Sequence, residues 1–331
     1  MRKEANIENW RKLYEIVNEI KEMKPWEYFW DMDIINLSDE DVYISVLGRG
    51  GDTYGISVYE GEKGFDKFKL LAMQQQLNIS PYMAMYMQDN LTCYWGDREE
   101  LSKKQRDIIK ELGYKYRGKN QWLYFMSHQT NYMPYNFDSD EVGRMTKYMS
   151  KLKKALELYF KEKPQIDFEQ EYILSYSDKE KKITSKKIYF YDFGFNGIQM
   201  ADNVDLVNDL KKLPKPLGIL EIDILPMFIA VNDKSYDRPA NPAMCMIVDK
   251  KSGMVMASEM STPETGIFRN FANTIIGTFF RYGLPRRINI CNSITGSLLE
   301  ELCDILGIKL GYENELPAIE EAKESLMRFM R

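Results

Sequence analysis

The fold of the second half is decided by residues 218–229, Gly218-Ile219-Leu220-Glu221-Ile222-Asp223-Ile224-Leu225-Pro226-Met227-Phe228-Ile229. This long apolar run follows the stiff spacer Pro214-Lys215-Pro216 and predicts a strong strand. Two shorter apolar runs, separated by the turn Asp249-Lys250-Lys251-Ser252-Gly253, predict a hairpin over residues 244–259. Helices and strands then alternate, at Phe268–Tyr282, Arg287–Cys291, Leu298–Leu306, Ile308–Tyr312 and Pro317–Met330. The second half is therefore expected to run β-β-β-α-β-α-β-α.

The first half predicts a second α/β unit. Apolar residues recur at helical spacing between residues 7 and 23, which indicates an amphipathic helix. The turn Gly48-Arg49-Gly50-Gly51-Asp52 separates two short strands and predicts a hairpin. The remaining elements expected are a strand at Met32–Leu37, a helix at Phe65–Leu77, one or two strands within Tyr82–Trp95, a helix at Leu101–Leu112, strands at Tyr114–Tyr116 and Trp122–Phe125, and a helix at Ser139–Phe160.

A domain boundary is expected at Pro164, which ends the last helix of the first half. A hairpin made of Glu171–Tyr176 and Lys186–Tyr191 would then open the second half. We therefore expect an N-terminal α/β domain over residues 1–163 and a C-terminal α/β domain with mixed sheets over residues 164–331.

The two halves share an order of elements: strand, hairpin, helix, strand, helix, glycine, strand. Met32-Asp33-Ile34-Ile35 resembles Ile222-Asp223-Ile224-Leu225, and Leu112-Gly113-Tyr114 resembles Leu306-Gly307-Ile308. An internal duplication would explain this echo. The alternative is that α/β proteins reuse the same order of elements independently.

The composition is that of an ordinary globular protein and narrows the classes of function. The chain has 331 residues, a formal net charge of −5 and a pI near 5.3, whereas nucleic-acid-binding domains usually have a basic stripe or a high pI. Four cysteines without a C-x-x-C pair and a single histidine disfavour a structural zinc site. The cysteines have apolar neighbours, which suggests buried free thiols in a reducing cytoplasm. With no signal peptide and no membrane-spanning apolar run, we expect a cytoplasmic protein.

Three short segments of the second half connect it to a known fold. Leu220-Glu221-Ile222-Asp223 suits a first strand, Val248-Asp249-Lys250-Lys251-Ser252-Gly253 a hairpin turn, and Gly283-Leu284-Pro285 the approach to a fourth strand. In this order and spacing they resemble the ribonuclease H-like fold, particularly the integrase and transposase core. The resemblance extends from about Leu217 to Met330.

The whole chain also resembles a group of uncharacterised bacterial two-domain proteins. They share an Arg-Gly-Lys-Asn-x-Trp block, here Arg117 to Trp122, and a C-terminal block. The latter is seen as Arg238-Pro239-x-x-Pro242 followed by Val248-Asp249-x-x-Ser252-Gly253. This second resemblance implies an architecture and no activity.

The ribonuclease H-like resemblance implies where catalytic carboxylates would lie. Enzymes of this class cut or join phosphodiesters with two metal ions held by clustered carboxylates. Asp223 matches the first-strand carboxylate, whereas the end of the fourth strand, Ile290-Cys291-Asn292-Ser293, has no carboxylate. A third acid would come from the last helix, where Glu320, Glu321 and Glu324 are available.

The catalytic candidates are therefore Asp223, Asp249 and Glu321, with Glu221 as a further substitute ligand. Each has a simpler interpretation: Asp223 as a hydrogen-bonded strand residue, Asp249 as the first residue of its turn, and Glu321 as part of a solvated helix face. Magnesium prefers several hard oxygen ligands, and Cys291 is a soft one. We therefore expect no metal or other cofactor, with Mg²⁺ as the alternative.

Arg117, Lys119 and Trp122 are the candidate binding residues. Cationic side chains next to aromatic rings suit a phosphate or a stacked base, although a plain turn explains them as well. Lysines also gather at 147–163 and 178–187, where solvated surfaces are the simpler interpretation. Three functions remain open: a non-catalytic binding or scaffold protein with a protein partner, a metal-dependent nuclease with a rearranged site, and a nucleic-acid binder that does not cleave.

Overall fold

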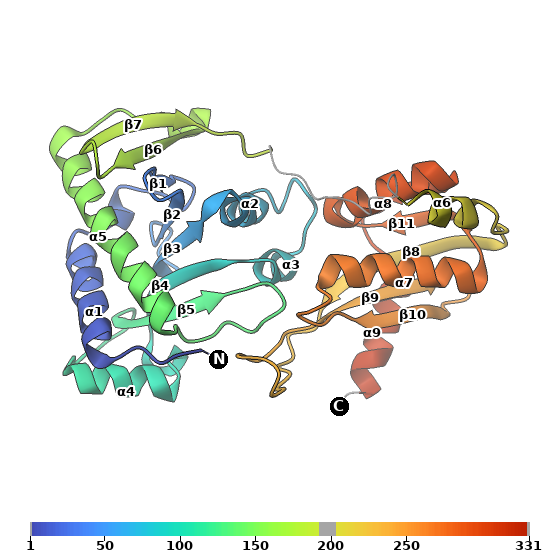
Figure 1. The fold of residues 1–331 in the computed structure, drawn as a ribbon, viewed down its shortest axis with the longest axis horizontal. Coiled ribbons are helices and arrows are strands. Elements are labelled where there is room, and N and C mark those ends of the chain that lie inside the picture. Colours follow the sequence, from blue (N-terminus) through green and yellow to red (C-terminus); the bar gives the residue numbers. More distant parts are fainter. Residues whose placement is uncertain (1, 192–202, 330–331) are drawn as a thin grey trace. The chain divides into compact units, whose positions relative to one another are not determined.

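The computed structural model describes residues 2–191 and 203–329 (Figure 1). The chain forms two compact units, each assembled from segments that are separated in the sequence. Unit 1 comprises Met1–Ala72, Gln88–Thr130 and Pro134–Asp192, and unit 2 comprises Met73–Met87, Asn131–Met133 and Phe193–Arg331. No helix within the described residues has the length and apolar character needed to cross a membrane.

Unit 1 is built on a mixed sheet in the order β5-β4-β3-β2-β1-β6-β7 (Figure 1). Its strands are β1 (Ile35–Leu37), β2 (Val42–Leu47), β3 (Tyr54–Glu60), β4 (Asn90–Gly96), β5 (Trp122–His128), β6 (Tyr172–Ser177) and β7 (Lys182–Lys187). All neighbouring strands are antiparallel except β1 and β6, which are parallel. Strands β2 and β3 form the hairpin that the glycine-rich turn predicts.

Helices cover both faces of this sheet. Helices α1 (Ile7–Glu22) and α5 (Ser139–Glu162) pack against each other, and their buried side chains share a core with β2–β5. On α1 the core residues recur at helical spacing, as the sequence predicts: Trp10, Leu13, Tyr14, Val17 and Ile20. Helix α2 (Gly61–Ala72) covers a smaller cluster on the other face, and α4 (Lys103–Leu112) lies beside α1. Three short 3₁₀ helices complete the unit, at Pro25–Glu27, Arg98–Glu100 and Phe168–Gln170.

The pairing of β6 moves the end of unit 1 beyond the boundary expected after residue 163. Leu174 lies opposite Ile35 in the parallel pair β1–β6, and Leu174 and Tyr176 are buried in the core of unit 1. The hairpin β6–β7 therefore belongs to the first sheet rather than opening the second unit. Its second strand also lies earlier than expected, at Lys182–Lys187 instead of Lys186–Tyr191.

Unit 2 is built on a five-stranded sheet in the order β10-β9-β8-β11-β12. Its strands are β8 (Leu217–Pro226), β9 (Ala243–Asp249), β10 (Val255–Met260), β11 (Pro285–Ile290) and β12 (Lys309–Tyr312). The first three strands pair in antiparallel fashion, β11 joins β8 in parallel, and β12 joins β11 in parallel. From β8 onward the unit runs β-β-β-α-β-α-β-α, the order of elements that the sequence predicts and that resembles the ribonuclease H-like fold.

The helices of unit 2 are α3 (Pro81–Tyr86), α6 (Val204–Lys211), α7 (Ile267–Tyr282), α8 (Ser293–Leu306) and α9 (Pro317–Phe329). Helix α7 contacts β9 and β10, and α9 contacts β8 and β9. Gly283 ends α7 with φ +87°, where a Cβ atom would lie 2.8 Å from the carbonyl oxygen of Pro214. Only glycine tolerates both constraints, so the turn into β11 is fixed at this residue.

Two expected elements differ from the structure. Part of Tyr82–Trp95 is the short helix α3 rather than a strand, because Ser80 caps its N-terminus and Pro81 occupies its first position. Residues Tyr114–Tyr116 form no strand: their backbone lies in an irregular segment, and the Tyr114 and Tyr116 rings stack with centroids 5.6 Å apart.

The two halves share an order of helices and strands, but their strands pair differently. In unit 2 the strand that follows the hairpin and a helix, β11, joins the first strand in parallel. The corresponding strand of unit 1, β4, instead joins the hairpin strand β3 in antiparallel fashion. The similar order of elements is therefore realised as two different sheets.

Candidate functional site

Asp223 on the central strand β8 and the residues that directly follow β11 form a polar cluster in unit 2. Asn292 donates through Nδ2 to Oδ1 of Asp223 at 3.2 Å, and the Cys291 thiol donates to Oδ2 at 3.8 Å. Nδ2 of Asn292 also lies 3.6 Å from the Cys291 sulfur. The cluster thus joins one carboxylate, one thiol and one amide.

Strand register brings these three residues together. Strands β8 and β11 are parallel, and Asn289 lies opposite Glu221. Asp223 lies two residues after Glu221, and Cys291 lies two residues after Asn289. The two side chains therefore meet on the same side of the sheet. The fold resemblance places the end of the fourth strand next to Asp223. In this chain that position holds a thiol and an amide instead of an acid, and both contact Asp223.

Asn292 is fixed by a second role as the N-cap of α8. Its Oδ1 accepts hydrogen bonds from the backbone N–H of Thr295 at 2.9 Å and from the Thr295 hydroxyl at 3.1 Å. Since the amide oxygen is occupied by the cap, only the Nδ2 group can face Asp223. The orientation of the amide is therefore determined by the start of the helix.

Burial raises the pKa of Asp223 to about 6. Desolvation of the carboxylate is the main cause, and it outweighs hydrogen bonds from the Ile224 backbone, Asn292 and Cys291 and the positive charge of Lys323. Burial and the charge of Asp223 in turn raise the pKa of the Cys291 thiol to about 11. The thiol therefore stays protonated at neutral pH, which makes it a hydrogen-bond donor and a poor nucleophile.

Lys323 is a member of this environment that sequence reasoning missed. On α9 it lies four residues after the buried Ile319 and one residue after Ala322, which packs on the sheet, so it borders the face of the helix turned toward β8 and β9. Its Nζ forms an ion pair with Glu320 at 2.7 Å. Helical spacing from Ile319 was the signal that could have identified it.

Glu221 lies on the same face as Asp223 but has a structural role. Its side chain is fully buried, and Oε2 accepts hydrogen bonds from the backbone N–H groups of Ala318 at 2.8 Å and Ile319 at 3.4 Å. Its Oε1 lies 3.2 Å from Nζ of Lys250. Glu221 therefore holds the N-terminus of α9 against the sheet, where a negative charge is favourable.

The other two catalytic candidates lie apart from Asp223. Asp249 is opposite Leu220 in the β8–β9 register, so its side chain is on the other face of the sheet from Asp223. Its Oδ1 accepts from the backbone N–H of Ser252 at 2.8 Å and from the Ser252 hydroxyl at 2.7 Å, as expected for the residue that starts the turn. Glu321 is exposed on α9, two residues after the buried Ile319, and helical geometry places it on the opposite side of the helix.

The donor set at Asp223 does not fit the magnesium pair that the fold resemblance implies. Magnesium requires several hard oxygen ligands in octahedral geometry, whereas the neighbours of Asp223 offer a soft sulfur and an amide N–H donor. Within residues 2–191 and 203–329, no group of three or more His, Cys, Asp or Glu side chains is placed to hold a metal ion. The polar cluster is better described as a closed hydrogen-bonded unit than as a metal centre.

The candidate binding residues of unit 1 lie on the loop before β5 and at its first position. Arg117 and Lys119 are exposed, and Trp122 is half-buried against Tyr116, with ring centroids 6.1 Å apart. The loop is a turn, as its simpler interpretation predicts, and the backbone N–H of Asn120 donates to Asp97 at 2.8 Å. Lys119 lines one pocket of unit 1, and Arg117 and Trp122 are not part of the lining of that pocket.

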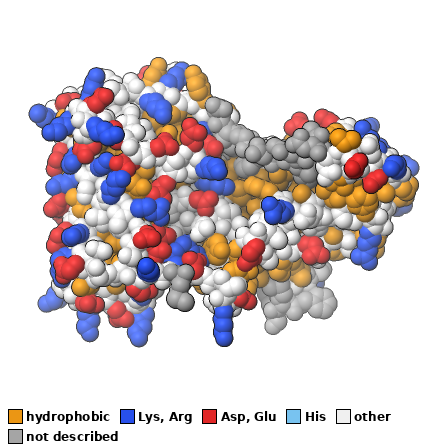
Figure 2. All heavy atoms as spheres, viewed as in Figure 1, with side chains coloured by type: hydrophobic (Ala, Val, Ile, Leu, Met, Phe, Trp, Pro, Cys, Tyr) orange, Lys and Arg blue, Asp and Glu red, His pale blue; other side chains and the backbone are white. Residues whose placement is uncertain are grey.

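The lysines of α5 are largely paired with acidic side chains of unit 1. Lys147 and Lys151 both form ion pairs with Glu40. Lys153 lies 2.8 Å from Glu19, and Lys154 lies 3.0 Å from Asp178. On the face of this unit that Figure 2 shows, side chains of both charges are interspersed. This arrangement agrees with a solvated helix face and offers no uniform basic stripe for nucleic acid.

Residues 10–175 match the protein family described as Domain of unknown function (DUF7309), which spans just over half of the chain. The chain belongs to this family. Residues 206–327 match a second family, described as Domain of unknown function (DUF6930). The first match lies mainly in unit 1 and the second lies in unit 2. No curated protein matches the chain.

Two solved structures illustrate the likeness of this chain to known folds. The catalytic core domain of HTLV-2 integrase, in complex with magnesium and in trimeric form, is 18% identical; the match covers 34% of this chain and 68% of that one, with a TM-score of 0.25. The Mos1 strand transfer complex is 12% identical, with 77% of this chain and 78% of that one covered and a TM-score of 0.22. At these values neither likeness bears on activity or ligands.

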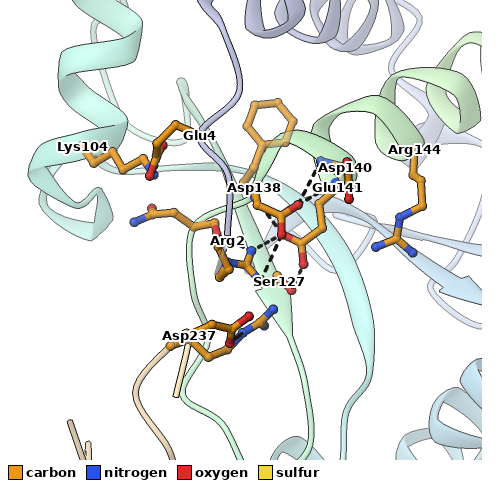
Figure 3. Close-up of polar contacts among 12 residues, drawn as sticks. Arg2, Glu4, Lys104, Ser127, Asp138, Asp140, Glu141, Arg144 and Asp237 are labelled. Atoms are coloured by element: carbon orange, nitrogen blue, oxygen red, sulfur yellow. Dashed lines mark hydrogen bonds and ion pairs between the residues drawn. The ribbon is translucent and has the colours of Figure 1, made fainter. Parts of the chain in front are cut away.

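Unit 1 contains a buried polar network at the start of α5 (Figure 3). Asp138 and Glu141 form a capping box, in which each side chain accepts a hydrogen bond from the backbone N–H of the other. Glu141 also accepts from the Ser127 hydroxyl at 2.7 Å and forms an ion pair with Arg2. The network ties the N-terminal segment, β5 and α5 together, and its polar groups serve the fold.

Proposed function

We propose that this protein is a non-catalytic binding or scaffold protein built on a degenerate integrase-like core. The observation that carries the proposal is the side chain of Asn292, which donates to Asp223 while capping α8. In a phosphodiester-cleaving relative, an acid at the end of the fourth strand would share a metal with the first-strand carboxylate. In this chain the residue near that position is Asn292, and its amide donates a hydrogen bond to Asp223 instead of sharing a metal with it.

The charges around Asp223 support the same proposal. Burial raises the pKa of Asp223 to about 6, so the carboxyl is mainly ionised at pH 7, but its surroundings favour the negative charge less than water does. Lys323 contributes positive charge from α9, the helix on which the resemblance expects a third acid. The free cysteines, three of them buried, are consistent with the reducing cytoplasm in which we place the protein.

Replacing Asn292 by aspartate tests the proposal with little structural change. Aspartate caps helices as well as asparagine does, so Asn292→Asp should keep α8 while adding a second carboxylate next to Asp223. We expect wild-type protein to show no saturable Mn²⁺ binding by calorimetry and no cleavage of single- or double-stranded DNA or RNA with Mg²⁺ or Mn²⁺. Asn292→Asp should gain Mn²⁺ binding, and the double variant with Asp223→Asn should lose it again.

The matched control is Asn289→Asp, which adds the same charge on β11 two residues before Cys291, and it should gain no metal binding that depends on Asp223. Metal-dependent cleavage by the wild-type protein that disappears in Asp223→Asn would overturn the proposal. So would Mn²⁺ binding of equal affinity in wild type and Asn292→Asp, because the asparagine would then not be what disables the centre.

A further inference from the structure

A pocket of about 300 Å³ in unit 1 has a lining that suits an aromatic anion. Its walls come from the end of α1 and the following turn, from the facing residues of β3 and β4, and from the loop before β5. The lining residues are Lys21, Lys24, Trp26, Glu27, Tyr54, Trp95, Lys119, Asn120 and Gln121. Pockets for small ligands begin at roughly 300 Å³, so this one suits a compact molecule.

The charge of the lining is mainly positive. Lys24 pairs with Glu27 at 3.3 Å, but no carboxylate lies within ion-pair distance of Lys21 or Lys119 among the residues that the structure describes. Nζ of Lys21 donates to the Gln121 amide oxygen at 2.7 Å, which holds the ammonium group at the wall. Lys21 interacts electrostatically with the neighbouring Glu22, but the pocket lining itself holds three lysines and one glutamate, and this excess of positive charge favours an anionic ligand.

Aromatic side chains form the rest of the wall. Trp26 packs edge-on against Tyr54, with centroids 5.2 Å apart, and against Trp95, with centroids 5.3 Å apart. Trp26 and Tyr54 remain half-buried, so their rings still offer an apolar surface to a ligand. Trp95 is 1% exposed, and its indole N–H has no acceptor among the described residues. This N–H has almost no accessible surface, so the half-buried rings of Trp26 and Tyr54 are the aromatic groups that a ligand would contact.

The loop that carries Lys119 is held in place without a ligand. Asn120 has φ +56°, in the left-handed region, and its backbone N–H donates to Asp97 at 2.8 Å. Gly118 has φ +92°, a conformation that glycine adopts at little cost. The pocket is therefore largely pre-formed, which lowers the entropic cost of binding.

We propose that this pocket binds a small aromatic anion of the nucleoside monophosphate class. The phosphate lies between Lys21 and Lys119, and the base packs against Trp26 and Tyr54. The assignment is independent of the function proposed for unit 2, because every lining residue belongs to unit 1. Of the three binding residues expected from the sequence, the proposed site includes Lys119. Residues of α1, the following turn and the sheet take the place of Arg117 and Trp122.

Adenosine monophosphate is the probe, added to the full chain and followed by tryptophan fluorescence and calorimetry. We expect saturable binding that quenches Trp26 and Trp95, at least about tenfold weaker binding of adenosine, and weaker binding at high salt. The double variant Lys21→Gln/Lys119→Gln should bind the monophosphate at least about tenfold more weakly, which is the effect of losing one charged hydrogen bond.

Lys115→Gln is the matched control, because Lys115 is exposed in the same segment but does not line the pocket. It should bind like wild type. The oligonucleotide hexa-adenylate is tested in the same way. If it binds more tightly than adenosine monophosphate and the double variant loses this binding, the pocket binds the terminal nucleotide of a single strand. The proposal is overturned if adenosine monophosphate shows no binding at millimolar concentration, or binds wild type and the double variant equally.

Discussion

At Asp223, a single buried carboxyl group makes folding depend on pH. Its folded-state pKa of about 6 lies above the ordinary value of 3.8, so the folded chain keeps a proton that the unfolded chain has already lost. Between roughly pH 4 and pH 6 the folded state therefore binds more protons, and stability falls as pH rises through this window. The full shift corresponds to about 3 kcal/mol at most.

Asp223→Asn should remove this pH-dependent cost. Relative to wild type, the variant should gain free energy of unfolding between pH 4 and pH 7, by up to about 3 kcal/mol, as measured by denaturant unfolding at each pH. Asp249→Asn is the matched control with the opposite sign. Hydrogen bonds from Ser252 lower the pKa of Asp249, so its variant should lose stability relative to wild type as pH rises toward the ordinary value of 3.8 and should follow wild type in parallel above about pH 5. Parallel pH profiles for the two variants would contradict the assignment of Asp223.

At the residue scale the sequence predicted the neighbours of Asp223, the turn role of Asp249 and the exposure of Glu321, but not the role of Glu221. The meeting of Asp223 with Cys291 and Asn292 follows from counting along two parallel strands, which the element order already implies. The role of Glu221 depends on where α9 begins relative to β8, and no local pattern encodes that distance. The separation of Asp249 from Asp223 depends on the hairpin register, which a shift of one residue would reverse.

At the scale of elements, the capping box of α5 is the clearest local signal in unit 1. Asp138-x-x-Glu141 stands at the start of a long amphipathic run, and in the structure each of these side chains accepts a hydrogen bond from the backbone of the other. Similar capping signals explain why α3 exists: Ser80-Pro81 starts a helix where an apolar run alone favours a strand. Elements with caps and clear periodicity were predicted closely, whereas short apolar runs were ambiguous between helix and strand.

Asp138→Ala should lower the stability of unit 1 by about 1 kcal/mol, within the range of N-cap losses. Its Oδ1 accepts from the backbone N–H of Asp140 at 3.0 Å and of Glu141 at 2.9 Å, and alanine would leave both donors without this partner. Asp140→Ala, which removes the same charge from the same turn at an exposed position, should cost clearly less. Equal losses in thermal unfolding would mean that helix-dipole electrostatics, and not the cap, stabilises α5.

At the scale of the whole molecule, the pairing of distant strands decides where a unit ends. Pro164 does end a helix, as its chemistry dictates, but the chain then returns to the first sheet through β6 and β7. Unit 2 likewise takes in α3: the Tyr86 hydroxyl donates to the carbonyl oxygen of Asn241 at 3.0 Å, 155 residues away. Local sequence predicts where each helix or strand ends. The unit to which an element belongs depends on contacts between residues far apart in the chain, and a single sequence does not show these contacts.

The chain cut after residue 163 should therefore fail to fold, whereas residues 1–192 should retain a cooperative unit 1. The shorter fragment loses the parallel partner of β1 and the buried side chains of Ile173, Leu174 and Tyr176. Each such side chain contributes about 1.5–3 kcal/mol through burial, so three of them approach the entire stability of an ordinary domain. The unpaired edge of β1 would also invite aggregation. Circular dichroism and size-exclusion chromatography distinguish the fragments, and a soluble 1–163 fragment melting at the same temperature as 1–192 would show that β6 and β7 are dispensable to unit 1.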